Sequence, residues 1–116
     1  MPDKLAAKPA DELSPRTLQE TASMFALLSA TVRLHILWLL VNGERDVGSL
    51  ADQTGQTLAT VSHHLAKLKL AGLVDVQRDG KRHVYTATDP HVLKVIQLAA
   101  GARLDESRPS RRARHA

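Results

Sequence analysis

Residues 56–67 carry the side chains of this chain that are best suited to binding chemistry. Gln56, Thr60, His63 and Lys67 share one face if this segment is helical, because successive residues of an α-helix are turned by about 100°. The face offers hydrogen-bond donors, acceptors and a cation, but no carboxylate that could activate a nucleophile or orient an imidazole. It therefore favours binding to a polar partner over catalysis.

The opposite face of the same segment is apolar and predicts burial. Val61, Leu65 and Leu68 fall on one stripe together with Leu58. His64 lies between the two faces, and two interpretations stay open for it. It is either a partly buried imidazole that is hydrogen-bonded within the local motif or a weak candidate for contact with the partner.

Several enzyme classes are excluded by what the sequence lacks. The chain has no cysteine, which removes disulfides, thiolate metal sites and cysteine nucleophiles. It also has no Ser-His-Asp order, phosphate-binding loop or paired acid motif. We therefore expect a binding protein and not an enzyme.

The flanking residues predict that this helix is the second of a helix-turn-helix. Asp46 is placed to cap a short helix over about 47–53, which ends at the loop Gly55-Gln56-Thr57. The next helix covers about 57–71 and ends at Gly72. A short helix, a tight turn and a second helix form the motif that places a recognition helix in DNA.

A basic β-hairpin is predicted directly after this motif. Residues 73–77 and 83–87 are rich in β-branched and apolar residues, and Asp79-Gly80 between them is a strong turn signal. The hairpin tip carries three cations, Arg78, Lys81 and Arg82. They either contact the DNA backbone or minor groove beside a recognition helix, or serve solubility at an exposed tip.

Two further helices are predicted before this unit. Ser14-Pro15 supplies an N-cap and a favoured first residue for a helix over about 15–28. A second helix follows and is closed by Asn42-Gly43, and its apolar side consists of Leu34, Leu37, Leu40 and Val41. Trp38 lies off that side, and we expect it to pack against the first or the last helix.

The first and last helices have more apolar surface than one small core needs. Asp89-Pro90 starts the last helix, whose stripe of Val92, Val95, Ile96 and Ala99 is flanked by Leu93 and Leu98. The first helix repeats Leu18, Ala22, Phe25 and Ala26 at helical spacing. Stripes of this width on surface helices predict a partner.

The composition is that of one small, mainly α-helical domain. The 116 residues include one Phe, one Trp and one Tyr, so the core must be built from aliphatic side chains. The formal net charge of +4 is compatible with binding to nucleic acid or to an anionic surface. We expect a flexible tail at 1–13, one domain over 14–105 and a basic, flexible tail at 106–116.

The sequence predicts a cytoplasmic protein with no membrane contact. Its N-terminus lacks the basic start and apolar core of a signal peptide. The longest strongly apolar stretch, Leu34 to Val41, is too short to cross a bilayer.

Several segments in order resemble the ArsR/SmtB family of bacterial winged helix-turn-helix regulators. They are RLHIL, GERDVGSLA, TVSHHLAKLKLAGLV and RDGKRHVY, although the family's usual Asp-Pro-Thr-Arg opening is here Ala30-Thr31-Val32-Arg33. The resemblance implies a mainly α fold with a small β-hairpin, in the order α-α-α-α-β-β-α. It also implies a homodimer held by the first and last helices, with two recognition helices about 34 Å apart on an imperfect inverted repeat.

On this basis we predict which residues contact DNA. The set consists of Gln56, Thr57, Thr60, Ser62, His63, Lys67, Arg78, Lys81 and Arg82. The alternative for each is an ordinary solvated surface position.

The resemblance also implies a metal site on the last helix. Family members that sense zinc, cobalt or nickel there use Asp-x-His near its start and two ligands thirteen and sixteen residues after the Asp, from the other subunit. Asp89 and His91 match the first pair, Ala102 cannot coordinate, and Asp105 can. The imidazoles that could complete such a site are His35, His83 and His115. Nitrogen and oxygen ligands suit Ni(II), Zn(II) or Co(II).

Other interpretations of these residues stay open. Asp89 could simply cap the helix, with His91 on the surface. The family's cysteine-based site on the third helix is excluded because DVGSLAD has no thiol. A regulator with a degenerate metal site that acts with a partner protein, and a winged helix that binds proteins only, are the alternatives to a metal-sensing regulator.

Overall fold

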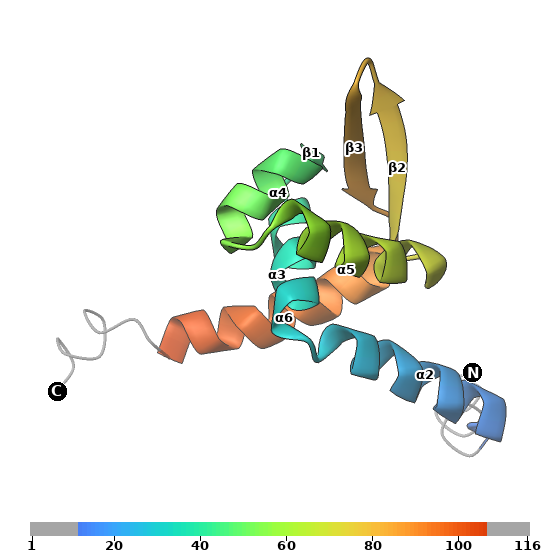
Figure 1. The fold of residues 1–116 in the computed structure, drawn as a ribbon. Coiled ribbons are helices and arrows are strands. Elements are labelled where there is room, and N and C mark those ends of the chain that lie inside the picture. Colours follow the sequence, from blue (N-terminus) through green and yellow to red (C-terminus); the bar gives the residue numbers. More distant parts are fainter. Residues whose placement is uncertain (1–11, 107–116) are drawn as a thin grey trace, which may run out of the picture.

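The computed structural model describes residues 12–106, which form five helices and a small antiparallel sheet (Figure 1). The elements in chain order are α2 Pro15–Leu28, α3 Thr31–Leu40, β1 Arg45–Asp46, α4 Val47–Thr54, α5 Leu58–Leu70, β2 Val74–Asp79, β3 Arg82–Ala87 and α6 Pro90–Glu106. The predicted order of helices and hairpin is confirmed. The two predicted tails lie almost entirely outside the described residues.

Side-chain caps fix the starts of three helices, at Ser14 and Asp46 as predicted and at Thr57, which was predicted to be the first residue of its helix. Ser14 Oγ accepts a hydrogen bond from the Thr17 amide at 3.1 Å, and Asp46 Oδ1 accepts one from the Ser49 amide at 2.8 Å. The Thr57 hydroxyl accepts one from the Thr60 amide at 3.1 Å. These oxygens satisfy backbone donors that the first helical turn leaves unpaired.

The sheet has a third strand that the sequence did not predict. Its order is β1-β3-β2, and β1 pairs with β3 through Arg45 opposite Tyr85 and Asp46 opposite Val84. Two residues are too short to show the alternation that marks a strand. The hairpin is also longer than predicted: Asp79 pairs with Arg82, so the turn is one residue later, at Gly80 and Lys81.

The core lies around α3, which contacts α2, α4, α5, α6 and β3. Ile36, Leu37, Leu50, Val61, Leu65 and Leu68 are fully buried. The predicted apolar side of α3 is partly wrong: Leu34 is 37% exposed, whereas Ile36 is buried. A helix with neighbours on several sides has no single buried stripe.

Leu58 is also misplaced by the predicted stripe. It is 58% exposed, whereas Val61, Leu65 and Leu68 on the same helix are buried. Leu58 is the first residue of α5, at the turn from α4, outside the layer that those three residues form.

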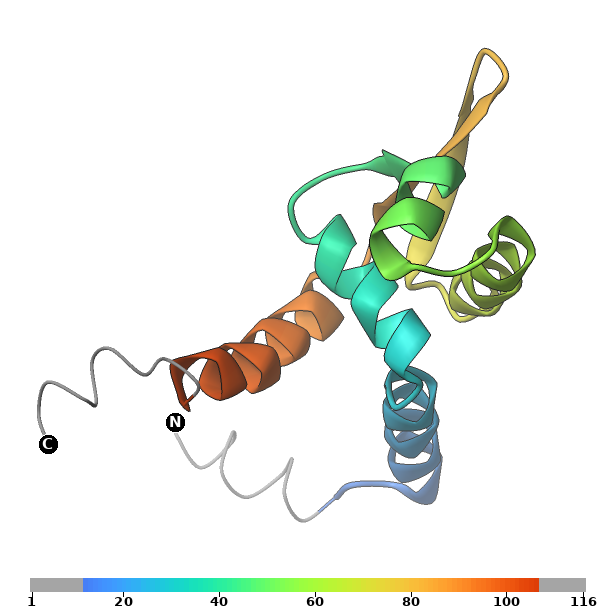
Figure 2. The ribbon, with the colours of Figure 1, turned by 60° about the vertical axis from the view of Figure 1, so that its left-hand side comes forward.

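Helices α2 and α6 extend away from this core on the side opposite the hairpin tip (Figures 1 and 2). Val92 and Ile96 of α6 are buried, but large side chains along both helices are exposed. These are Leu18 at 52%, Phe25 at 51%, Leu98 at 69% and Leu104 at 55%. Most of the exposed large apolar side chains of the described residues thus lie on the two helices that were predicted to meet a partner, although Leu70 at the end of α5 is the most exposed, at 90%.

Among residues 12–106, no single helix is long and apolar enough to cross a membrane. The pair α2 and α3 meets the length and composition criteria only when taken together, and the chain bends by 90° between them.

Candidate nucleic-acid interface

Helix α5 presents the predicted polar face to solvent. Gln56, Thr57, His63 and Lys67 are exposed, and Thr60 is half-buried. The fixed helical spacing brings Thr60, His63 and Lys67 onto adjacent positions of one face. Ser62 is exposed as well, but it is turned about 100° from His63 and lies on another part of the surface.

Two of these hydroxyl groups also bind each other. The Thr57 hydroxyl donates to the Thr60 hydroxyl at 3.0 Å while it accepts from the Thr60 amide. The start of α5 is therefore held by the same threonines that we predict to approach DNA.

His64 is half-buried and bonded to α3. Its Nδ1 lies 3.2 Å from Nη1 of Arg33, and Nε of Arg33 donates to the carbonyl of Leu27 at 2.8 Å. Burial lowers the pKa of His64 below its ordinary value, and the nearby positive charges of Arg33, His63 and Lys67 lower it further. The first interpretation from the sequence is confirmed in part: the imidazole is partly buried and hydrogen-bonded, but its partner lies on α3, outside the helix-turn-helix.

The three cations of the hairpin have different surroundings. Arg82 donates from Nε to Oδ2 of Asp46 at 3.0 Å, and its Nη1 lies 3.9 Å from Oδ2 of Asp79. Arg78 donates weakly to the Gly80 carbonyl at 3.4 Å, and Lys81 is exposed at the tip. Two carboxylates thus face Arg82, whereas Lys81 has no ion pair among the contacts of the described residues.

Asp46 connects the hairpin to the helix-turn-helix. One carboxylate oxygen caps α4 and the other binds Arg82. The Ser49 amide and, to a smaller extent, Arg82 lower the pKa of Asp46 because both stabilise the charged carboxylate. Sequence analysis found the cap but missed the ion pair, because Arg82 is 36 residues away along the chain.

The hairpin follows α5 along the chain and packs beside it. In both views it rises from α5 in the direction away from α2 and α6 (Figures 1 and 2). The arrangement is that of a recognition helix with an adjacent wing.

The predicted metal ligands of one protomer do not meet. Asp89 Oδ1 accepts hydrogen bonds from the amides of His91 at 2.9 Å and Val92 at 3.2 Å, so this carboxylate caps α6. Asp105 lies sixteen residues later on the same helix, which corresponds to about 24 Å. His35 and His83 are exposed on α3 and β3, and His115 lies outside the described residues.

Within residues 12–106, no three His, Asp or Glu side chains come together as a metal-binding group. A site that uses both ends of α6 therefore needs a second protomer.

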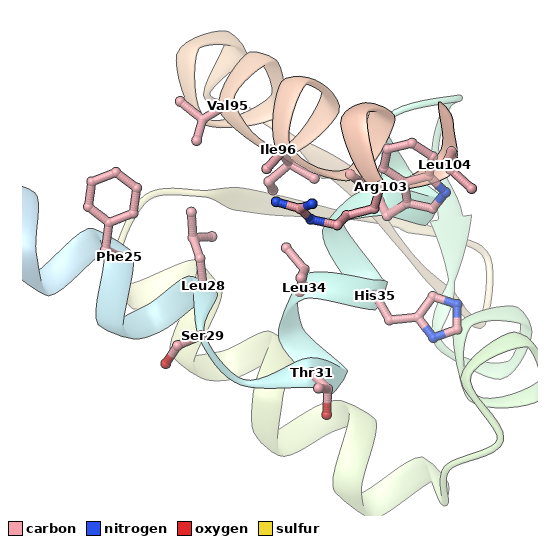
Figure 3. Close-up of a pocket in the computed structure, with 13 residues that line it drawn as sticks. Phe25, Leu28, Ser29, Thr31, Leu34, His35, Val95, Ile96, Arg103 and Leu104 are labelled. Atoms are coloured by element: carbon pink, nitrogen blue, oxygen red, sulfur yellow. The ribbon is translucent and has the colours of Figure 1, made fainter. Parts of the chain in front are cut away.

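An apolar groove of about 850 Å³ lies between α2, α3 and α6. Phe25, Leu28, Leu34, Trp38, Val95 and Ile96 are among its lining residues. Leu28, Leu34 and Ile96 point toward one another between the helices, and Arg103 extends along the groove (Figure 3). Trp38, which was expected to pack against the first or the last helix, packs against the core and lines this groove between them.

Comparisons with known proteins identify relatives of this fold. Residues 30–76 match the family described as "Bacterial regulatory protein, arsR family". The chain is 38% identical over 73 residues to the HTH-type transcriptional regulator KmtR of Mycobacterium tuberculosis, and the match covers 63% of this chain and 56% of KmtR. It thus spans little more than half the length of that relative.

Two other relatives are covered more completely. A cadmium resistance transcriptional regulatory protein, the CadC homolog of Staphylococcus aureus, is 32% identical over 89 residues, with 76% of this chain and 74% of that protein covered. The solution NMR structure of the homodimeric winged helix-turn-helix DNA-binding domain of Mb0332 from Mycobacterium bovis matches with a TM-score of 0.69. It is 33% identical, and the match covers 84% of this chain and 93% of that one.

Proposed function

Because the chain belongs to the ArsR family of bacterial regulatory proteins, we propose that it is a transcriptional regulator that binds DNA as a homodimer. The observation that carries the proposal is the exposed face of α5, which is polar, cationic and free of carboxylates, beside a basic hairpin. Such a face supplies the donors and acceptors that read base edges, and the wing supplies phosphate contacts.

The predicted contact residues keep the roles that the sequence suggested, with one change of emphasis. Gln56, Thr60, Ser62 and His63 would approach bases or phosphates, and Thr57 would do so at the helix start. Lys67, Arg78 and Lys81 would contact phosphates. Arg82 belongs to the same set, but its ion pair with Asp46 supports a second role in holding the wing.

We propose that the operator is an imperfect inverted repeat. A twofold dimer places two α5 helices about one helical turn of DNA, roughly 34 Å, apart or a multiple of it. The exposed apolar side chains of α2 and α6 and the groove between these helices support a dimer held by them. The relative from Mycobacterium bovis is described as homodimeric, which agrees with this proposal.

Metal-dependent regulation is part of the proposal. Asp89 and His91 lie two residues apart at the start of α6, and the cap at Asp89 uses only one of its two carboxylate oxygens. Asp105 of the second subunit is the third proposed ligand, for Ni(II), Zn(II) or Co(II). Such a metal would change DNA affinity only if it bound the two conformations of the dimer differently.

A regulator without a metal effector is the second candidate. The fourth ligand position is Ala102, which has no donor atom, and the Asp89 carboxylate already has a structural role. Such a protein could act with a partner protein. In either case we propose one domain over 14–105, in the cytoplasm.

DNA binding is tested by selecting a duplex from a random pool with the wild-type protein. We expect an inverted repeat, bound with an affinity that falls as salt rises. A wild-type protein that binds no duplex at low salt would refute the proposal. Repeating the titration with Ni(II), Zn(II) or Co(II), for the wild type and His91→Ala, separates the two candidates, because only a metal sensor would lose a response.

A further inference from the structure

The contact between Arg33 and His64 determines which ring nitrogen of His64 carries the proton. A guanidinium group only donates hydrogen bonds, so His64 Nδ1, 3.2 Å from Arg33 Nη1, must accept. In a neutral imidazole the other nitrogen then holds the hydrogen. His64 is therefore the tautomer with a proton on Nε2.

Arg33 is itself held in place by a second bond. Its Nε donates to the Leu27 carbonyl at 2.8 Å, in the last turn of α2, and the residue is half-buried. A flipped His64 ring would place the Cδ2–H group against the Arg33 donor, and because that carbon cannot accept a hydrogen bond, the bond would be lost. The orientation of the ring is thus set from α3 and not by α5 alone.

The protonated nitrogen faces away from Arg33, because the two ring nitrogens point to opposite sides of the imidazole. His64 is half-exposed and borders the face that carries Thr60, His63 and Lys67. The His63 ring lies beside it, edge to face, with centroids 5.6 Å apart. Nε2–H is therefore a donor at the margin of the proposed DNA-binding face.

We propose that Arg33 is a positioning residue that presents the Nε2–H group of His64 to a hydrogen-bond acceptor on DNA. This inference rests on the proposed DNA-binding function. The acceptor is a phosphate oxygen or a base edge such as guanine N7 or O6, since both accept from an imidazole N–H. Arg33 does not touch DNA in this arrangement.

Two matched substitutions of His64 separate the roles of its nitrogens. The side-chain amide of Asn lies near the position of Nδ1, so His64→Asn keeps an acceptor for Arg33 but loses the distal donor. The amide of Gln lies near the position of Nε2, so His64→Gln keeps the distal donor. Binding is measured on the duplex that the wild-type protein selects from a random pool.

We expect His64→Asn to weaken binding by roughly tenfold for each half-site, the value of one hydrogen bond, and His64→Gln to stay within about threefold of the wild type. Equal binding by the wild type and His64→Asn would overturn the inference while leaving the proposed function intact. Equal losses in both variants would overturn it too. Failure of the wild type itself to bind DNA would instead refute the proposed function.

A second duplex of the same length and scrambled sequence distinguishes a phosphate acceptor from a base acceptor, when the affinities of the wild type and His64→Asn are measured on both duplexes. A His64→Asn loss that is equal on both duplexes indicates a phosphate. A loss confined to the selected duplex indicates a base edge. Either result supports the contact.

Nitrogen-15 NMR of the imidazole tests the role of Arg33 without DNA. Near neutral pH the wild type should show only the Nε2–H form of His64, and Arg33→Met should show a mixture of both tautomers. Wild-type protein with a proton on Nδ1, or an unchanged spectrum in a folded Arg33→Met variant, would overturn the positioning role. Unfolding of Arg33→Met leaves the wild-type spectrum and the His64 pair as the deciding measurements.

Discussion

Single side chains in this domain combine a structural bond with a proposed functional one. Thr57 caps α5 within the predicted DNA-contact set, Asp89 caps α6 within the predicted metal set, and Asp46 both caps α4 and binds Arg82. The first backbone N–H groups of a helix have no acceptor within the helix, and these side chains accept hydrogen bonds from them. Substitutions at these positions therefore change stability as well as binding.

Asp46 predicts a specific loss of stability in acid. Its pKa is lowered in the folded state, so the unfolded chain binds the proton more readily. The stabilisation is present above the ordinary value of about 3.9 and is lost as the pH falls through the lower folded-state pKa. Thermal unfolding between about pH 6 and pH 3 should show a steeper acid loss of Tm in the wild type than in Asp46→Asn. Identical slopes would show that this carboxylate is not held in its charged form.

Ala102 offers a gain-of-function test of the metal site. It is exposed on α6, thirteen residues after Asp89, so Ala102→His would supply an imidazole where the proposed set has no donor. We expect the variant dimer to bind Zn(II) or Ni(II) at least tenfold more tightly than the wild type in calorimetry, because a four-ligand site replaces one of three ligands. The same substitution combined with His91→Ala should lose that gain. A gain that survives His91→Ala would place the new site elsewhere.

At the scale of elements, the features that depend on neighbouring residues in the sequence were predicted, whereas those that depend on long-range contacts were missed. The caps at Ser14, Asp46 and Asp89 located three helix starts because they act within three residues. Strand β1 and the Arg82 ion pair were missed because both join segments far apart in the chain. The buried faces of α3 and the exposure of Leu58 depend on which neighbours surround a helix, which its own periodicity does not contain.

The same division holds for the candidate site: its local features were predicted from the sequence, and its long-range contacts were not. Periodicity located the polar face of α5, and the turn signal located the basic wing. Arg33 was not singled out as a partner of His64, because 31 residues separate them and an Arg on a core helix has no local signature. Within one protomer, Asp89 and Asp105 lie at opposite ends of α6, so the proposed metal ligands can come together only in a dimer.

Substitutions of the two wing cations Lys81 and Arg82 should differ in their effect on the salt dependence of DNA binding. Lys81→Ala removes a proposed phosphate contact, so the slope of log Kd against log salt should fall by about one unit for each wing engaged. Arg82→Ala should weaken binding with a smaller change in slope, because Asp46 and Asp79 already face its charge. Lys94→Ala is the matched control, since Lys94 is an exposed cation on α6 opposite the apolar stripe. Equal slope changes for Lys81→Ala and Arg82→Ala would assign both residues to phosphates.

For the whole molecule, the distribution of apolar surface is the main constraint on assembly. Monomeric proteins rarely expose large contiguous apolar patches, yet Phe25, Leu98 and Leu104 are each at least half exposed on α2 and α6. Both helices lie on the side of α3 away from the wing, where they extend in different directions (Figures 1 and 2). A dimer that covers them leaves both α5 faces available to one duplex.

A charge placed on this surface should separate the protomers. Phe25 lines the groove and is 51% exposed, so Phe25→Glu would bury a carboxylate in the proposed interface. We expect a monomer by light scattering at micromolar protein and at least tenfold weaker DNA binding, with little loss of protomer stability. Ser23→Glu adds the same charge to another face of α2 and should remain dimeric. A Phe25→Glu protein that stays dimeric would move the interface off this groove.

The small strand β1 and the helix α3 before it set a lower limit on the size of a fragment that can fold. A chain that began at Val47 would contain the helix-turn-helix and the hairpin in full, but not the two residues that pair with β3 or the carboxylate that caps α4. It would also lack Ile36 and Leu37, two fully buried side chains. Truncation at the boundary of the motif should thus yield an unfolded peptide, and the shortest folded version must begin before Thr31.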